Sequence, residues 1–481
     1  MAQKKILTGT IVFSLLAFLL PLSNFLLLPI YTKYFPPSEY AVLAILTSFT
    51  NLIASIGAFR ISVALNPYYF EYKDSPKEFN QFYGNILLFT IISGALTLLV
   101  GFVFGDMLFK LVLKNDQSIP FFPLGIIALI IGLLTTFKSP YVVLLRLEKD
   151  VYKYALFFCL NAFLVIVLQL LFVIYFEVGI IGVLIARMGA EFVGAIIIFY
   201  HGFSFMRYKL NKKHLVQALR FCIPIIPTGF IGWVYAFGDR FFIERFIDLR
   251  SLGIYSILIA ITGLVTMLSD ALSNGIVPYL YDYYAEGVKK NMDNINKILR
   301  FYIHSILLSC SFLIMLGCNL NLFIVNVDYI GIYKFVSIGV IVFLIEAYYK
   351  IYFNNLIYLK KSKSILYLSF SSIAIVFILY LLFIPVFGIW GVILSNVIGN
   401  IVILLFAYYY SQQKLTIILN VKQLIVVPSV VVFTFFLTEL FIYVDRLNYS
   451  FIGIFQFILI FSFLTIINVK ELNSLIKNFK N

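Results

Sequence analysis

The sequence contains few charged residues, which make up 12% of the chain of 481 residues, whereas soluble domains carry about 25%. Hydrophobic residues account for 62%, so a soluble globular domain is excluded and lipid is the expected solvent. The 4 cysteines show neither a CxxC spacing nor a Cys/His cluster, so no disulfide and no metal site is predicted. The chain lacks a Gly-Lys dipeptide, which excludes a GxxxxGK[ST] phosphate loop. No cofactor is expected.

Long apolar segments follow one another along the whole chain. A helix that crosses the hydrocarbon needs about 20 apolar residues, and windows of this length predict an all-α membrane protein with about 14 transmembrane helices. The segments that connect these helices are short, which leaves no room for a soluble catalytic domain. The predicted spans are 6–31, 41–65, 85–109, 122–145, 154–176, 178–203, 221–243, 252–280, 298–325, 332–357, 365–386, 389–411, 424–444 and 450–468.

The order of landmarks in the first half recurs about 210 residues later, a signature of repeat folds. Lys138 recurs as Lys350, and Gly179 in VGIIGVLIA recurs as Gly388 in FGIWGVILS. The repeat predicts two parallel six-helix lobes. We expect an N-lobe with spans 1–6 at residues 1–215 and a C-lobe with spans 7–12 at residues 216–415. Two additional spans and a tail occupy residues 416–481.

Most of the 36 Lys and Arg residues fall in alternate connecting segments, including those next to both ends of the chain. By the positive-inside rule, this bias predicts a multi-pass protein with both termini in the cytoplasm. The net charge of +14 is therefore explained by orientation and by contact with anionic lipid headgroups. No nucleic-acid partner is expected.

Several ionisable residues fall inside the predicted spans, where each costs roughly 2.5–3.5 kcal/mol unless it is paired or lines a wet cavity. A positively charged cavity between two lobes favours an anionic substrate. The cations predicted to line such a substrate-binding cleft are Arg60, Lys138, Arg187, Arg240 and Lys350. The acids predicted to couple an ion or to pair with these cations are Glu191, Asp239, Asp270 and Glu346.

Simpler explanations for these charges stay open. Two pairs lie four residues apart on one helix face and could only neutralise each other: Arg187 with Glu191, and Glu346 with Lys350. Asp239 and Arg240 lie near the outer end of their span and Arg60 near a cytoplasmic end, so these side chains could reach water by snorkelling. Lys138 has no acidic neighbour within one turn.

Three segments resemble a known family of bacterial membrane proteins. They are LLLPIYTKYFPPSEYAVLAILTSFTNLI, IPIIPTGFIGWVYAFGDRFFIERF and FGIWGVILSN. They resemble polysaccharide-biosynthesis flippases, the exporters of lipid-linked oligosaccharide for O-antigen, lipopolysaccharide and capsule. These exporters belong to the multidrug/oligosaccharidyl-lipid/polysaccharide (MOP) superfamily. Many members have twelve spans, so the last two predicted spans are a departure from the family pattern.

The resemblance implies a transporter of the bacterial inner (plasma) membrane and not an enzyme. Its implied substrate is an oligosaccharide linked to undecaprenyl diphosphate, which moves from the cytoplasmic to the periplasmic leaflet by alternating access. The implied partners are this lipid-linked oligosaccharide, the bilayer and the polysaccharide polymerase machinery. Arg60 and Arg240 match the family's cationic positions best, whereas Lys138 and Lys350 are inferred from the repeat alone.

Two other functions are compatible with a polytopic chain. A cation-coupled multidrug exporter of the same superfamily needs an acidic cation site in its first helices, yet the span 6–31 contains no Asp or Glu. A membrane polysaccharide polymerase needs a long outer loop with catalytic residues, and the connecting segments are short. Both alternatives are therefore weaker than the flippase.

Overall fold

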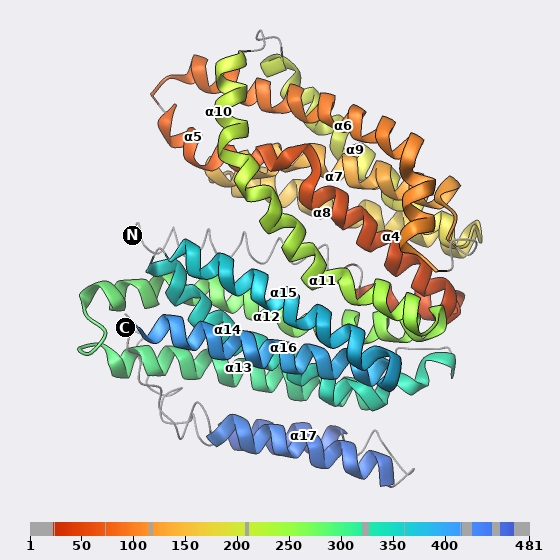
Figure 1. The fold of residues 1–481 in the computed structure, drawn as a ribbon, viewed down its shortest axis with the longest axis vertical. Coiled ribbons are helices and arrows are strands. Elements are labelled where there is room, and N and C mark those ends of the chain that lie inside the picture. The colour runs from red at the N-terminus through yellow and green to blue at the C-terminus, as the bar shows by residue number, and fades with distance from the viewer. Residues whose placement is uncertain are drawn as a thin grey trace. The chain divides into compact units, whose positions relative to one another are not determined.

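The computed structural model describes the helical part of the chain in ten pieces. They are residues 23, 25–72, 74–114, 119–206, 211–319, 327–359, 361–413, 415, 426–444 and 453–465. Within them, 11 helices are long and apolar enough to cross a membrane, and two shorter apolar helices follow near the C-terminus. This confirms the predicted all-α membrane fold (Figure 1). Most of the predicted span 6–31 lies outside the described residues.

The chain forms two compact units, Met1–Ser256 and Ile257–Asn481. The lobe boundaries predicted near residues 215 and 415 stay a prediction. Each unit is described by itself below.

The first unit packs its helices around α7 (Ile126–Leu147), which contacts α4 (Pro37–Ile56), α6 (Pro76–Val112) and α9 (Ile180–Met206). α8 packs on α9, and α11 packs on α4. The remaining elements of this unit are α3 (Leu28–Tyr34), η1 (Gly57–Ala64), α5 (Leu65–Glu71), η2 (Phe121–Gly125), α8 (Val151–Leu170), η3 (Leu171–Tyr175), α10 (Lys212–Cys222), η4 (Ile223–Ile225) and α11 (Ile226–Phe246).

Local sequence explains where several of these helices begin. α4 and α6 start at Pro37 and Pro76, where the missing N–H of proline costs no intrahelical bond. The carboxylate of Asp150 accepts a hydrogen bond from the backbone N–H of Lys153 at 3.0 Å and so caps α8.

The second unit is built around α14 (Tyr333–Tyr358). This helix contacts α13 (Met292–Cys318), α15 (Ser362–Phe387), α16 (Ile389–Gln412) and α17 (Val427–Val444). α16 also packs along α15, and α13 packs on α17. The remaining elements of this unit are the larger part of α12 (Leu249–Glu286), η6 (Val327–Ile332) and a last helix, Gly453–Thr465.

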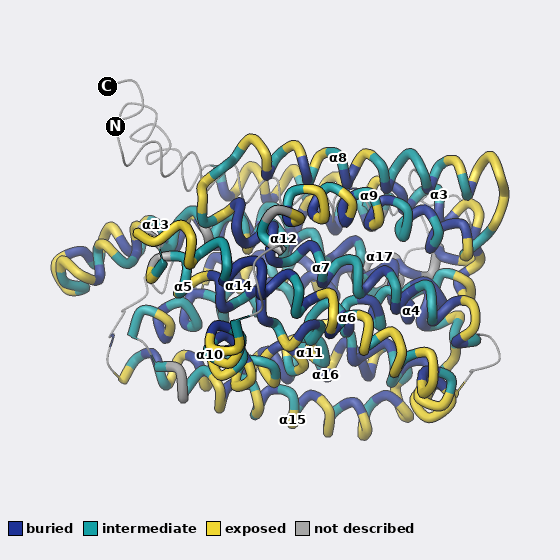
Figure 2. The backbone as a smooth tube through the Cα atoms, turned by 90° about the horizontal axis from the view of Figure 1, so that it is seen from above, coloured by how far each residue is buried: buried dark blue, intermediate teal, exposed yellow. Residues whose placement is uncertain are grey.

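The outward faces of the long helices are apolar. Exposed Leu, Val, Ile and Phe residues line α6 and α15, where a soluble protein would expose polar residues. Figure 2 shows the exposed positions along these two helices in yellow. This pattern is the one expected for helices surrounded by lipid.

One pair of landmarks from the predicted repeat has a positive φ in both units. Gly179 (φ 71°) directly precedes α9, and Gly388 (φ 57°) directly precedes α16. A positive φ is accessible to glycine at little cost. The two glycines therefore mark equivalent helix starts.

Candidate functional site

The second predicted span is broken, and the break contains Arg60. The sequence predicts one helix over 41–65, but α4 ends at Ile56 and the next turn is left-handed. Ala58, Phe59 and Arg60 have φ values of 47°, 52° and 54°. Each non-glycine residue in this region costs roughly 1–2 kcal/mol. Such strain persists only where the surroundings enforce it, and it is common at functional sites.

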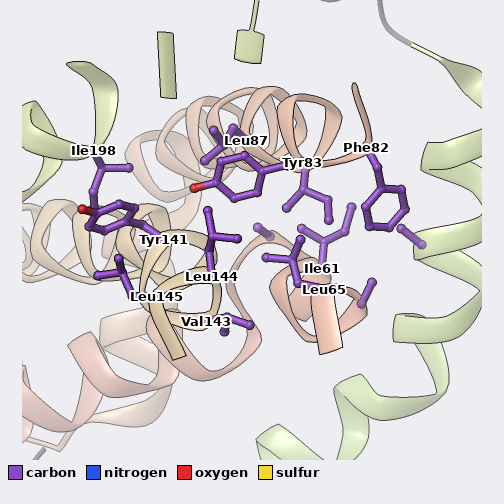
Figure 3. Close-up of a cluster of buried hydrophobic side chains, with 14 of the residues drawn as sticks. Ile61, Leu65, Phe82, Tyr83, Leu87, Tyr141, Val143, Leu144, Leu145 and Ile198 are labelled. Carbon is purple, nitrogen blue, oxygen red and sulfur yellow. The ribbon is translucent and has the colours of Figure 1, made fainter. Parts of the chain in front are cut away.

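Neighbouring helices hold this turn in place. The hydroxyls of Ser62 and Ser139 form a hydrogen bond of 2.6 Å between η1 and α7. The thiol of Cys222 at the end of α10 donates to the carbonyl of Ile61 at 3.8 Å. Below the turn, Ile61 and Leu65 belong to a cluster of buried apolar side chains from α6, α7 and α9 (Figure 3). The break is therefore anchored on both its polar and its apolar side.

A pocket of about 230 Å³ lies against this turn, entirely within the first unit. Arg60 and Arg146 supply its charge, and Ser55, Asn66 and Ser139 supply polar groups. None of the residues that line it is Asp or Glu. A concave site with charge of one sign concentrates ions of the opposite sign. The pocket is therefore suited to an anion.

Neither arginine is neutralised inside the described part of the chain. Arg60 is half-buried and Arg146 is exposed, and neither forms an ion pair with a described carboxylate. The guanidinium group can donate two parallel hydrogen bonds to a phosphate or carboxylate, and it stays charged even where it is partly desolvated. Both side chains are available to a ligand.

Arg146 is not among the predicted site residues, because its position fits a cationic segment on the cytoplasmic side. The sequence feature that indicates its place in the pocket is its helical spacing from other residues of α7. Thr136, Ser139, Val143 and Arg146 recur at intervals of three or four residues along α7, and all four line the pocket. Residues at this spacing share one face of a helix, so Arg146 could have been assigned to the face of α7 that meets Arg60.

Lys138 lies on the same helix but is already paired. Its ammonium group forms a salt bridge with Glu191 of α9, and the two residues are 7% and 5% exposed. The ammonium also lies 5.8 Å from the ring centre of Phe157. Its positive charge is thus offset inside the unit, and its contact with a substrate stays a prediction.

Arg187 is not neutralised by Glu191, contrary to the simpler explanation given by their spacing. Because Glu191 pairs with Lys138, Arg187 is left with a weak hydrogen bond to the hydroxyl of Thr47, at 3.5 Å. The half-buried Arg187 is therefore a third cation, after Arg60 and Arg146, without a described carboxylate partner.

Asp239 and Arg240 are buried and do not reach solvent by snorkelling. Asp239 Oδ1 accepts hydrogen bonds from the backbone N–H of Arg240 at 2.8 Å and from its Nη1 at 3.2 Å. Asp239 Oδ2 accepts one from the hydroxyl of Tyr255 at 2.5 Å. Arg240 Nη1 also donates to the carbonyl of Ala236 at 3.0 Å. This pair is satisfied within the first unit.

In the second unit, Lys350 bridges two carboxylates. Its Nζ lies 2.7 Å from Asp270 Oδ1 on α12 and 3.1 Å from Glu346 Oε1 on α14. The predicted pairing of Glu346 with Lys350 is confirmed. Asp270 remains largely exposed, with 58% of its side chain accessible. The three groups together carry one negative charge, so this cluster is not cationic.

The described residues contain no group of three or more His, Cys, Asp or Glu side chains that could hold a metal ion. Cys159, Cys222 and Cys310 are free thiols. The arginine-lined pocket is therefore the candidate ligand site in the first unit.

Sequence comparison assigns the first part of the chain to a family. A family model described as "Polysaccharide biosynthesis protein" matches residues 6–284, which is more than half of the chain. No curated protein matches the sequence.

Solved structures share the fold over most of the chain. The lipid II flippase MurJ in an inward closed conformation is 17% identical with a TM-score of 0.72, over 96% of this chain and 99% of that one. An inward-facing multidrug resistance MATE family transporter of the MOP superfamily is 16% identical with a TM-score of 0.65, over 83% and 98% of the two chains. A MOP superfamily transporter from Pyrococcus furiosus is 17% identical with a TM-score of 0.61, over 85% and 95%. The predicted superfamily fold is confirmed.

Proposed function

This chain belongs to the polysaccharide biosynthesis protein family, and we propose that it is a flippase for oligosaccharide linked to a polyprenyl diphosphate. It moves the lipid-linked oligosaccharide from the cytoplasmic to the outer leaflet of the bacterial plasma membrane by alternating access. Both termini lie in the cytoplasm. The polysaccharide polymerase machinery receives the sugar on the outer side.

The pocket with Arg60 and Arg146 is the observation that carries this proposal. A diphosphate group brings about two negative charges into the membrane, and the desolvation of an unpaired ion is prohibitively costly. Two arginines without carboxylate partners replace part of the lost hydration by charge-assisted hydrogen bonds. A cationic drug would instead require acidic groups, and this pocket has none.

The membrane potential supports the proposed direction of transport. A membrane potential that is negative inside favours the outward movement of a negative charge by about 2.3 kcal/mol per charge at 100 mV. We assign the contacts with the diphosphate to Arg60 and Arg146. Arg187 is a further cationic position in the first unit, whereas the charge of Arg240 is compensated by Asp239.

We propose a different role for Lys138 and Lys350. Lys138 and Lys350 are each held by carboxylates of their own unit, so a ligand must compete with Glu191, or with Asp270 and Glu346. We propose that the acids pair with the lysines in this state and compensate their positive charge inside each unit.

Reconstituted proteoliposomes test this function. A fluorescent oligosaccharide on a polyprenyl diphosphate is placed in the membrane, and its movement between leaflets is followed by quenching from outside. Arg60→Ala and Arg146→Ala should slow transfer at least tenfold, the loss expected for one hydrogen bond to a charged group. Lys110→Ala removes an exposed cation of the same unit that pairs with Asp106, and it should transfer at the wild-type rate.

Two results would refute the proposal. Wild-type transfer by both arginine variants would exclude the pocket as the headgroup site. Export of cationic drugs by the wild-type protein, with no transfer of the lipid-linked sugar, would favour the multidrug exporter.

A further inference from the structure

The helix α11 packs against residues that line the arginine-lined pocket, and a glycine of α11 makes this contact. α11 packs along α4, where the indole N–H of Trp233 donates to the carbonyl of Ser48 at 2.7 Å. One turn earlier, the buried Gly229 faces the end of α4 and the left-handed turn. Its neighbours there are Ser55 and Arg60, and both of them line the pocket.

There is no space for a side chain at Gly229. A Cβ at this position would lie 2.6 Å from Nη1 and 3.1 Å from Cδ of Arg60, and 2.8 Å from the carbonyl oxygen of Ser55. All three distances are shorter than ordinary van der Waals contact between a carbon and these atoms. The guanidinium of Arg60 therefore lies directly against the bare backbone of α11.

We infer that Gly229 is a positioning residue for the anion site, because its missing side chain allows the Arg60 guanidinium to lie where it lines the pocket. This inference rests on the proposed function. Arg60 forms no described salt bridge that would hold it elsewhere, so the surface of α11 limits the positions its guanidinium can occupy. A methyl group at 229 displaces the cation, and the bound anion loses a hydrogen bond.

A purely structural role for Gly229 makes a different prediction. If glycine is needed only because α11 approaches the Ser55 carbonyl, alanine at 229 is harmful whatever residue stands at 60. If glycine is needed for the guanidinium, the harm depends on Arg60. Lysine at 60 keeps a positive charge but has no Nη1 atom, so it removes the shortest of the three contacts. A double-mutant cycle between positions 229 and 60 separates the two roles.

The experiment measures the affinity of purified wild-type and variant protein for a short-chain polyprenyl diphosphate, with the matching uncharged polyprenol as the reference ligand. Gly229→Ala should weaken binding of the diphosphate roughly tenfold, as for the loss of one hydrogen bond to a charged group. In the Arg60→Lys background, the same substitution should change affinity less than twofold. Gly232→Ala is the matched control, because a Cβ at this glycine on the next turn of α11 meets nothing within 4 Å.

Wild-type affinity in Gly229→Ala, or an equal loss in both backgrounds, would overturn the inference. Should Gly229→Ala fail to fold, the double variant decides. Recovery of folded protein with Arg60→Lys supports a clash with the guanidinium, and continued misfolding assigns the clash to Ser55 and overturns the inference. Arg60→Ala reports on the proposed function separately, since wild-type diphosphate affinity in that variant refutes the anion site itself.

Discussion

Glu191 pairs with Lys138 of another helix and not with Arg187, which lies one turn away on the same helix. The ion pair compensates the charge of the buried lysine, and Arg187 is left with only a weak hydrogen bond to Thr47. Two cations on neighbouring helices therefore have different surroundings: the lysine is paired with a carboxylate between α7 and α9, and the arginine has no carboxylate partner among the described residues. Their positions in the sequence alone do not separate these surroundings.

Removing one partner of the buried pair should destabilise the protein. Lys138→Ala or Glu191→Gln leaves an uncompensated buried group, which costs about 3–5 kcal/mol. The double variant Lys138→Met with Glu191→Leu should recover most of the loss, because an apolar pair needs no charge compensation. The measurement is thermal unfolding in detergent. Single variants as stable as the wild type would show that the pair is open to solvent or ligand.

Arg187 should behave in the opposite way. Arg187→Gln is expected to leave the melting temperature unchanged, because no described carboxylate depends on this guanidinium. Transfer of the lipid-linked sugar should fall roughly tenfold, as for one lost hydrogen bond to a charged group. Arg187→Lys keeps the charge and is the control. Full transfer by Arg187→Gln would remove this residue from the cationic site.

The left-handed turn can be tested at Ala58, which has a φ of 47°. Ala58→Gly should raise the free energy of unfolding by up to about 1 kcal/mol, because glycine adopts this conformation without strain. Ala44→Gly, in the regular part of α4, should lower it by about 1 kcal/mol. Chemical denaturation of both variants measures whether the free energy of unfolding rises or falls. A loss of equal size at both positions would mean that the turn at 58 is not strained.

The Asp239 carboxylate should be more important for stability than for transport specificity. Asp239→Asn removes the charge that compensates the buried Arg240, so we expect a loss of about 3 kcal/mol. Tyr255→Phe removes one hydrogen bond to Asp239 and should cost only about 1 kcal/mol. Thermal unfolding measures both. Equal stability of Asp239→Asn and the wild type would argue that Arg240 finds its counter-charge elsewhere.

The sequence predicted the membrane class and most spans because about 20 apolar residues are a strong local signal. It also predicted the pairing of Glu346 with Lys350, since the two residues lie four apart within one span. Arg60, predicted as a cation within a span, lines the pocket, and its contact with a substrate stays a prediction. Contacts between helices could not be predicted in this way. Glu191, the partner of Lys138, lies 53 residues further along the sequence, and no local pattern indicates which faces of two helices pack together.

The break at Arg60 could not have been predicted from local rules. Its residues, Gly57 to Arg60, contain no proline, and three of them adopt the left-handed conformation without being glycine. Tertiary contacts such as the bond between Ser62 and Ser139 impose this conformation against local preference. Arg146 was not predicted as a site residue, because a cation near the end of a span is interpreted as a signal of membrane orientation.

We propose that Arg60 and Arg146 bind the diphosphate of the lipid carrier. An experimental structure of the protein with a polyprenyl diphosphate-linked oligosaccharide bound would decide this. We expect phosphate oxygens to lie within hydrogen-bond distance of both guanidinium groups, inside the pocket beside the left-handed turn. A diphosphate bound elsewhere, with Arg60 and Arg146 making no contact with it, would refute the proposed site.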